Sequence, residues 1–117
     1  MKIYEIKDIL KAEVLTGENR MEGTVAAGGG ADLMDDVLTA VAEGAVLLTG
    51  LTSEQVLQTA KIAGVALIVF VRGKKPEKHI LELAESYNLP MLTTRFSLFV
   101  ASGRLYMNGL RGLDGSW

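Results

Sequence analysis

A short basic loop near the middle of the chain carries its most distinctive polar chemistry. Arg72, Gly73 and Lys74 directly follow the apolar run 65–71. Cationic side chains at such a strand end could hold a carboxylate or a phosphate, because ligands of open α/β sheets bind beyond the carboxyl ends of the strands. Basic loops are also common simply because charge keeps a surface solvated. The loop therefore predicts a small-anion site, with an ordinary surface loop as the alternative.

Three further turns offer backbone amides or hydroxyl groups at predicted strand ends. Amides that glycines leave accessible can approach an anion at a helix start, and hydroxyl groups can add hydrogen bonds. Tight turns and helix caps use the same residue types, so a structural role competes with ligand binding at each turn. Neither the dinucleotide-binding glycine string nor the P-loop string is present. The candidate residues are Gly28, Gly29, Gly30, Thr49, Thr52, Ser53, Thr94 and Arg95.

No residue constellation for making or breaking bonds is evident. The chain has no cysteine, and its single histidine, His79, lies beside Lys78 without a nucleophile motif. Asp32, Asp35 and Asp36 group at a predicted helix start, where the helix dipole favours acidic residues without any metal. The sequence predicts a protein without catalytic residues, metal or cofactor. The alternative is an enzyme whose active site forms at a dimer interface, from residues that do not stand out in the sequence.

Composition narrows the classes of partner. The 117 residues carry a formal net charge of −2, so no excess of positive charge attracts nucleic acid or an anionic membrane. The start of the chain lacks the apolar core of a signal peptide, and the run 65–71 is far shorter than a membrane span. We expect one cytoplasmic domain over 1–117, with neither nucleic acid nor a membrane as partner.

The elements that must position these residues alternate in type along the chain. Short apolar runs predict strands, and apolar residues at i, i+3 and i+4 predict helices. Predicted strands are 13–15, 24–28, 45–49, 65–71, 89–93 and an edge strand over 105–107. Predicted helices are 7–12, 32–42, one begun by Thr52 or Ser53 and closed by Gly64, one over 76–87 with Pro76 in its first turn, and 95–102.

Alternation of strands and helices predicts the fold class. We expect an α/β fold, a three-layer Rossmann-like sandwich with a mainly parallel sheet and alternating helices. The regular core should cover about residues 23–103, and a flexible tail should follow over about 108–117.

Several of these segments resemble the DRTGG domain family. The likeness is carried by 23–30, 44–50 (GAVLLTG), 67–76 (LIVFVRGKKP), 80–84 (ILELA) and 88–92 (NLPML). The family's Asp-Arg pair aligns with Thr52-Ser53 and its Thr-Gly-Gly with Val71-Arg72-Gly73, so Gly73 alone of these is retained. The resemblance implies a free-standing, non-catalytic regulatory or accessory module. It also implies a homodimer that binds a small anionic ligand, with an adenine nucleotide as the candidate.

A second hypothesis assigns the chain to another class of protein. Residues 109–117 are glycine-rich and end in Trp117, and a lone tryptophan on a tail could anchor a protein partner. A frayed terminus explains the same residues. The alternative to a ligand-binding module is therefore a protein-interaction subunit of a larger metabolic or redox enzyme complex, without a small ligand.

Overall fold

A five-stranded sheet forms the middle layer of the protein. The structure, a computed structural model, describes residues 1–34 and 43–112. The strand order is β1-β5-β4-β3-β2, with β1 antiparallel to β5 at one edge and the other neighbours parallel. Both faces are covered by helices, so every residue of the strands β3 to β5 is buried. The strands are β1 (Glu13–Thr16), β2 (Ala27–Gly30), β3 (Ala45–Thr49), β4 (Leu67–Phe70) and β5 (Met91–Thr93).

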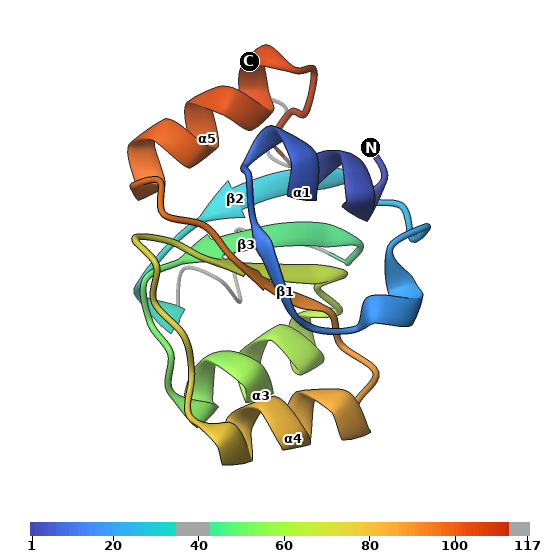
Figure 1. Cartoon of the computed structure of the whole chain (residues 1–117), viewed down its shortest axis with the longest axis vertical. Helices are drawn as coiled ribbons and strands as arrows, with labels where there is room; N and C mark the ends of the chain where they lie inside the picture. The colour runs from blue at the N-terminus through green and yellow to red at the C-terminus, as the bar shows by residue number, and fades with distance from the viewer. Residues whose placement is uncertain (35–42, 113–117) are drawn as a thin grey trace.

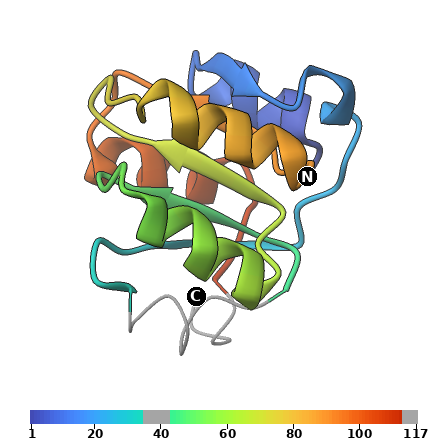
Figure 2. The ribbon, with the colours of Figure 1, turned by 90° about the horizontal axis from the view of Figure 1, so that it is seen from below.

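Helices form the two outer layers. They are α1 (Ile3–Ile9), α3 (Glu54–Ala63), α4 (Lys78–Ser86) and α5 (Leu98–Met107), with a short 3-10 helix η1 (Glu18–Arg20). Figure 1 shows α1 and α5 on one face of the sheet and α3 and α4 on the other, and Figure 2 shows α3 and α4 side by side. Because side chains alternate along a strand, Leu47 packs with one helix pair and its neighbours Val46 and Leu48 with the other. The predicted three-layer α/β sandwich is confirmed.

The described parallel strands follow one another in sequence from β2 to β5. Right-handed crossovers that all run in one direction place α3 and α4 on the same face. Among these strands the order does not reverse, so they lack the switch point at which doubly wound sheets open a crevice for nucleotides. A binding site on this fold must therefore be built by the loops at the strand ends.

The glycine run 28–30 lies within β2 and not in a turn after it, so the bounds of the predicted strand 24–28 are wrong. The physical reason is close packing. A Cβ at Gly28 would lie 3.0 Å from Leu110 Cδ2, and one at Gly30 would lie 2.9 Å from Leu98 Cδ1. Glycine lets α5 and the segment after it approach the strand this closely.

Two predictions for the segment that forms helix α5 differ from the structure. The helix expected over 95–102 begins at Leu98, where Ser97 Oγ accepts a hydrogen bond from Val100 N at 3.2 Å. The edge strand expected over 105–107 is wrong, because these residues continue the helix to Met107. Ala101 and Leu105, four residues apart, are both buried on its inner face, as helical periodicity requires.

Helix α1 begins earlier than the predicted helix 7–12. The backbone N–H of Lys2 donates to Glu5 Oε1 at 2.8 Å, and Ile3 and Ile6 are buried three residues apart. Helix α4 begins at Lys78, so Pro76 lies before the helix and not in its first turn.

The remaining elements agree with the sequence analysis to within a few residues. β4 occupies the inner part of the predicted strand 65–71, and β5 occupies the last three residues of the predicted strand 89–93. Gly64 ends α3 in a left-handed conformation with φ 74°. Most of the helix predicted over 32–42, together with 113–117, lies outside the described residues. Within the described ranges, no helix has the length and apolar character needed to span a membrane.

Candidate anion-binding site

A polar pocket of about 310 Å³ lies at the carboxyl ends of β4 and β5. Among the described residues, four cationic residues and one acidic residue line it, which is a formal charge of +3 in a chain of net charge −2. Charges of one sign that line a hollow focus the electrostatic field and attract the opposite charge. The lining residues are Lys11, Glu13, Arg72, Gly73, Lys75, Thr93, Thr94 and Arg95.

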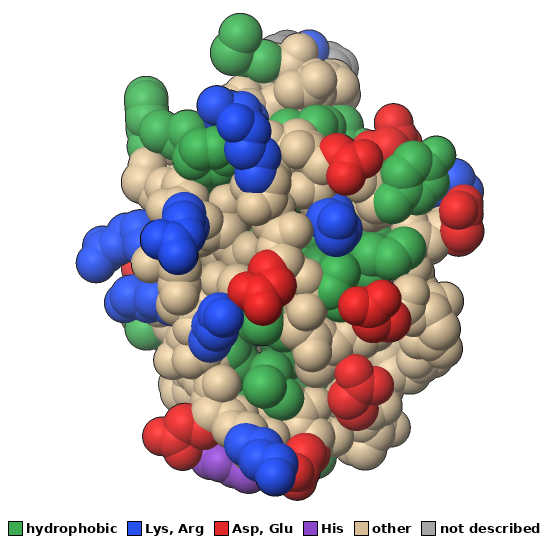
Figure 3. All heavy atoms as spheres, viewed as in Figure 1, with side chains coloured by type: hydrophobic (Ala, Val, Ile, Leu, Met, Phe, Trp, Pro, Cys, Tyr) green, Lys and Arg blue, Asp and Glu red, His purple; other side chains and the backbone are tan. Residues whose placement is uncertain are grey.

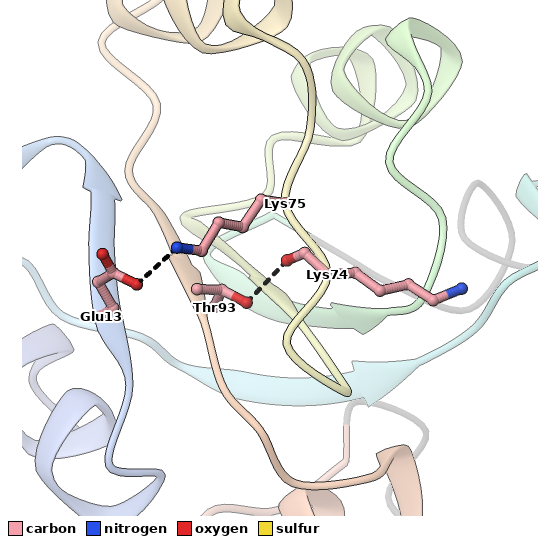
Figure 4. Close-up of polar contacts among 4 residues, drawn as sticks. All are labelled: Glu13, Lys74, Lys75 and Thr93. Atoms are coloured by element: carbon pink, nitrogen blue, oxygen red, sulfur yellow. Dashed lines mark hydrogen bonds and ion pairs between the residues drawn. The ribbon is translucent and has the colours of Figure 1, made fainter.

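Hydrogen bonds fix the segments that form this pocket. The hydroxyl group of Thr93 donates to the carbonyl oxygen of Lys74 at 2.7 Å, which ties the loop after β4 to the end of β5 (Figure 4). The hydroxyl group of Thr94 donates to the buried carbonyl oxygen of Leu10 at 2.7 Å. The backbone N–H of Gly73 donates to Thr94 O at 2.7 Å. The pocket is therefore a preformed hollow and not a loose loop.

An ion pair crosses the pocket. Lys75 Nζ lies 3.0 Å from Glu13 Oε2 (Figure 4), and the two side chains are 53% and 63% exposed. Pairs between exposed side chains contribute about 0–1 kcal/mol. The pair orients Lys75 toward β1 but holds it weakly.

Two guanidinium groups of the pocket have no partner among the described residues. Within residues 1–34 and 43–112, the guanidinium groups of Arg72 and Arg95 form neither a hydrogen bond nor an ion pair, and both residues are exposed. Figure 3 shows Lys and Arg side chains gathered along the left margin of the molecule. A guanidinium group presents a planar fork of donors that suits carboxylate or phosphate oxygens. These donors are available to an anion.

Backbone strain is concentrated around the same pocket. The described residues other than glycine with positive φ are Lys11 (48°), Arg72 (58°) and Asn88 (57°). Asparagine adopts this conformation readily, whereas for other residues with a Cβ it costs about 1–2 kcal/mol. Strain of this kind is kept preferentially at functional sites. Two of the three strained residues are cations of the pocket.

The structure brings together only part of the predicted site. Arg72, Gly73, Thr94 and Arg95 line the basic pocket, and Lys74 is bonded to it through its carbonyl group. Sequence reasoning missed Lys11 and Glu13, whereas Lys75 and Thr93 directly adjoin the predicted site residues Lys74 and Thr94. The residues from the α1–β1 segment carry no local signal, because only the antiparallel pairing of β1 with β5 places them here.

Thr49 lies outside the basic pocket. Its hydroxyl group donates to Asp32 Oδ1 at 3.1 Å, and the backbone N–H of Gly50 donates to the same oxygen at 2.7 Å. The carboxylate of Asp32 thus occupies the donors that an anion would need, and it would repel one. Ser53 precedes α3 at the N-cap position but forms no capping hydrogen bond through its side chain, and Thr52 precedes it.

The glycine run 28–30 lines a different, mostly apolar cavity of about 310 Å³. The cavity lies between β2 and α5, near Leu105, Tyr106 and Leu110. The backbone N–H of Gly28 donates to the carbonyl oxygen of Arg111 at 3.0 Å, so one of the amides is already paired. β2 is the edge strand farthest from β1, so this cavity is separate from the basic pocket.

Each described residue considered above for catalysis or metal binding has a local partner of its own. His79 Nδ1 lies 3.5 Å from Glu77 Oε2, and both side chains are mostly exposed at the start of α4. No group of three or more His, Cys, Asp or Glu residues within the described ranges could hold a metal ion. Asp32 is bonded to Thr49 and Gly50, and the other two aspartates of the predicted cluster lie outside those ranges.

Fold and pocket together define a small mixed α/β domain whose charged groups gather at the ends of parallel strands. The DRTGG domain profile matches residues 5–106. The chain therefore belongs to the DRTGG domain family, as its resemblance indicated. No curated protein matches the sequence.

The fold is also similar to that of a solved structure. That structure contains the CBS and DRTGG domains of the regulatory region of a Clostridium perfringens pyrophosphatase, in complex with the activator diadenosine tetraphosphate. The TM-score is 0.75 at 24% sequence identity, over 89% of this chain. The match covers 45% of the solved chain, so this chain spans less than half of it. At this identity the likeness supports the fold.

Proposed function

We propose that this DRTGG domain is a non-catalytic regulatory or accessory module that binds a small anionic ligand in the basic pocket. The observation that carries the proposal is the convergence of Lys11, Arg72, Lys75 and Arg95 on one hollow. Among the described residues a single carboxylate, Glu13, offsets these charges there. A regulatory region of the solved relative binds a nucleotide activator, so adenine nucleotides are the first ligands to test, with inorganic phosphate and citrate beside them.

Ligand-dependent stabilisation tests this proposal. A ligand that binds only the folded state raises the free energy of unfolding by mass action, by about 2.7 kcal/mol at a hundredfold excess over Kd. We expect the midpoint of thermal unfolding to rise with millimolar anion for the wild-type protein. The rise should be lost in Arg72→Gln and kept in Lys78→Gln, whose lysine lies on α4 outside the pocket. An unchanged midpoint with every anion would refute the proposal.

A second candidate function, association with another copy of this chain, is favoured by the outer face of α5. Phe99 and Met107 are 88% and 87% exposed, and Val100 and Tyr106 are partly exposed beside them. Gly103 lies midway between Phe99 and Met107, and a Cβ there would meet nothing within 4 Å. A glycine inside a helix costs about 0.5–1 kcal/mol relative to alanine, and nothing in the described chain requires this one.

The spacing of these residues suits an antiparallel pair of α5 helices. Phe99 and Met107 lie four residues on either side of Gly103, so a two-fold axis at Gly103 would set each Phe99 against the partner copy's Met107. Helix α5 has ten residues and is therefore about 15 Å long. A contact along so short a helix buries less surface than the roughly 800 Å² per partner that stable dimers bury. We therefore propose a weak homodimer.

The absence of cysteine from the chain makes cross-linking a direct test. Gly103→Cys should form a disulfide-linked dimer under mild oxidation, because the two copies of residue 103 would meet at the axis. Ile62→Cys is the matched control, since Ile62 is 77% exposed on α3 at the opposite face. Equal cross-linking of both variants, or a monomer at every concentration in sedimentation, would contradict an α5 dimer.

A further inference from the structure

The basic pocket offers charge but no surface for a nucleobase. Its lining residues within the described part of the chain are charged or polar, or glycine, and none of them is aromatic or aliphatic. Bases are recognised by stacking on aromatic rings and by apolar walls. Phe96 is the nearest aromatic residue in sequence, directly after Arg95, and the guanidinium group of Arg104 lies 4.2 Å from its ring. The lining therefore suits the charged part of a ligand alone.

Several uncharged donors of the pocket are already used within the protein. The hydroxyl groups of Thr93 and Thr94 donate to backbone carbonyl oxygens. The backbone N–H of Arg72 donates to Phe96 O at 2.8 Å, and that of Gly73 donates to Thr94 O. The side chains of the four cations are therefore the main donors for recognition, and an uncharged ligand would gain little here.

Glu13 competes with any anion for one of those cations. Its carboxylate lies 3.0 Å from Lys75 Nζ, and both side chains are more than half exposed, so solvent weakens the pair. A ligand with one negative charge would break the Lys75–Glu13 ion pair and form one similar ion pair with Lys75 in its place. A compact ligand with several charges could also reach the cationic side chains that Glu13 does not contact.

We propose that the ligand of this pocket is a compact polyanion of the diphosphate or triphosphate class. This inference rests on the anion-binding function proposed above. The polyanion binds by taking Lys75 from Glu13, and no nucleoside is needed for recognition. Glu13 thereby acts as the residue that sets specificity, because it excludes singly charged anions and yields to multiply charged ones. Its release also loosens the first residue of β1, which is paired with Thr93 at the pocket.

Calorimetry with paired ligands tests the ligand class. The probes are diphosphate against ADP and triphosphate against ATP, with adenosine and acetate as the uncharged and singly charged references, all at low ionic strength without divalent metal. Each inorganic chain should bind within about threefold of its nucleotide, because the nucleoside adds no contact in this pocket. Adenosine and acetate should give no binding heat.

A matched pair of glutamate variants tests the exchange at Lys75. Glu13→Gln should bind triphosphate about two- to fivefold tighter than wild type, since a competing exposed charge is removed. Glu82→Gln is the control, because Glu82 forms a similar exposed pair with Lys78 at 4.0 Å on α4. Lys75→Gln should weaken binding. Ligand-free unfolding midpoints verify that each variant is folded.

The outcomes separate this inference from the proposed function. If ATP binds at least tenfold tighter than triphosphate, a nucleoside is recognised and the ligand class is wrong, while the anion site stands. If Glu13→Gln binds like wild type, the exchange at Lys75 is overturned. If none of the charged probes binds, both the inference and the anion-binding function fail.

Discussion

The hydroxyl group of Thr94 donates a 2.7 Å hydrogen bond to the carbonyl oxygen of Leu10, in the buried interior and across 84 positions of the chain. Each of these two residues is followed directly by a cation of the basic pocket, Lys11 after Leu10 and Arg95 after Thr94. The bond joins the end of β5 to the segment between α1 and β1. The two cations that follow it are therefore brought to the same hollow from opposite ends of the chain.

Replacement of Thr94 by valine removes this bond with little change of shape. Because the carbonyl oxygen of Leu10 would then be buried without a partner, we expect Thr94→Val to lower the free energy of unfolding by about 1–3 kcal/mol. Anion affinity should fall as well, since Lys11 and Arg95 lose their common anchor. Urea unfolding and calorimetry measure the two effects. Thr94→Ser keeps the hydroxyl group and should retain most of both properties; an equal loss in both variants would show that the bond is not the cause.

The strained cations should separate stability from binding. Lys11→Gly and Arg72→Gly relieve a left-handed backbone but add chain entropy to the unfolded state, so we expect the free energy of unfolding to change by less than about 1 kcal/mol. Anion affinity should nevertheless fall in both variants. Asn88→Gly relieves a similar conformation away from the pocket and should leave affinity intact. A loss of well over 1 kcal/mol in both cation variants would mean that their side chains support the fold.

Two glycines should respond oppositely to an added side chain. Gly28→Val should lower the free energy of unfolding by about 1–3 kcal/mol, because the new atoms meet Leu110 and Val46 in a packed layer. Gly103→Ala should raise it by about 0.5–1 kcal/mol, because the site is open and alanine favours the helix. Urea unfolding of dilute, monomeric protein measures both. The same sign for the two substitutions would contradict the packing described for β2 and α5.

Ionic strength should distinguish the two proposed interactions. The distance over which charges act falls from about 30 Å at 0.01 M salt to about 10 Å at 0.1 M. We expect polyanion affinity to fall steeply over this range. Association through α5 should not weaken as salt is added, since that face is apolar. Parallel calorimetry and sedimentation across the range test this, and loss of both interactions with added salt would argue against an apolar dimer contact.

Local sequence patterns were sufficient to predict much of the fold. The apolar run around Leu67–Phe70 predicts a central strand, the spacing of Ile80 and Ala84 predicts the inner face of α4, and Gly64 marks the end of α3. These features depend on neighbours within a few positions, so they can be recognised along the chain. Segment 105–107 shows the limit of such patterns, because three consecutive apolar residues fit a strand as well as the last turn of a helix.

By itself, the sequence determined the layers, the parallel pairing and the basic loop at Arg72, since periodicity and residue type act over short distances. Tertiary structure alone decided that Lys11 and Glu13 join that loop, that Asp32 takes the donors at Thr49 and Gly50, and that the glycines of β2 serve packing. Each of these outcomes depends on a contact between segments far apart in the chain. Such contacts are set by how the whole core closes, and no single segment carries that information.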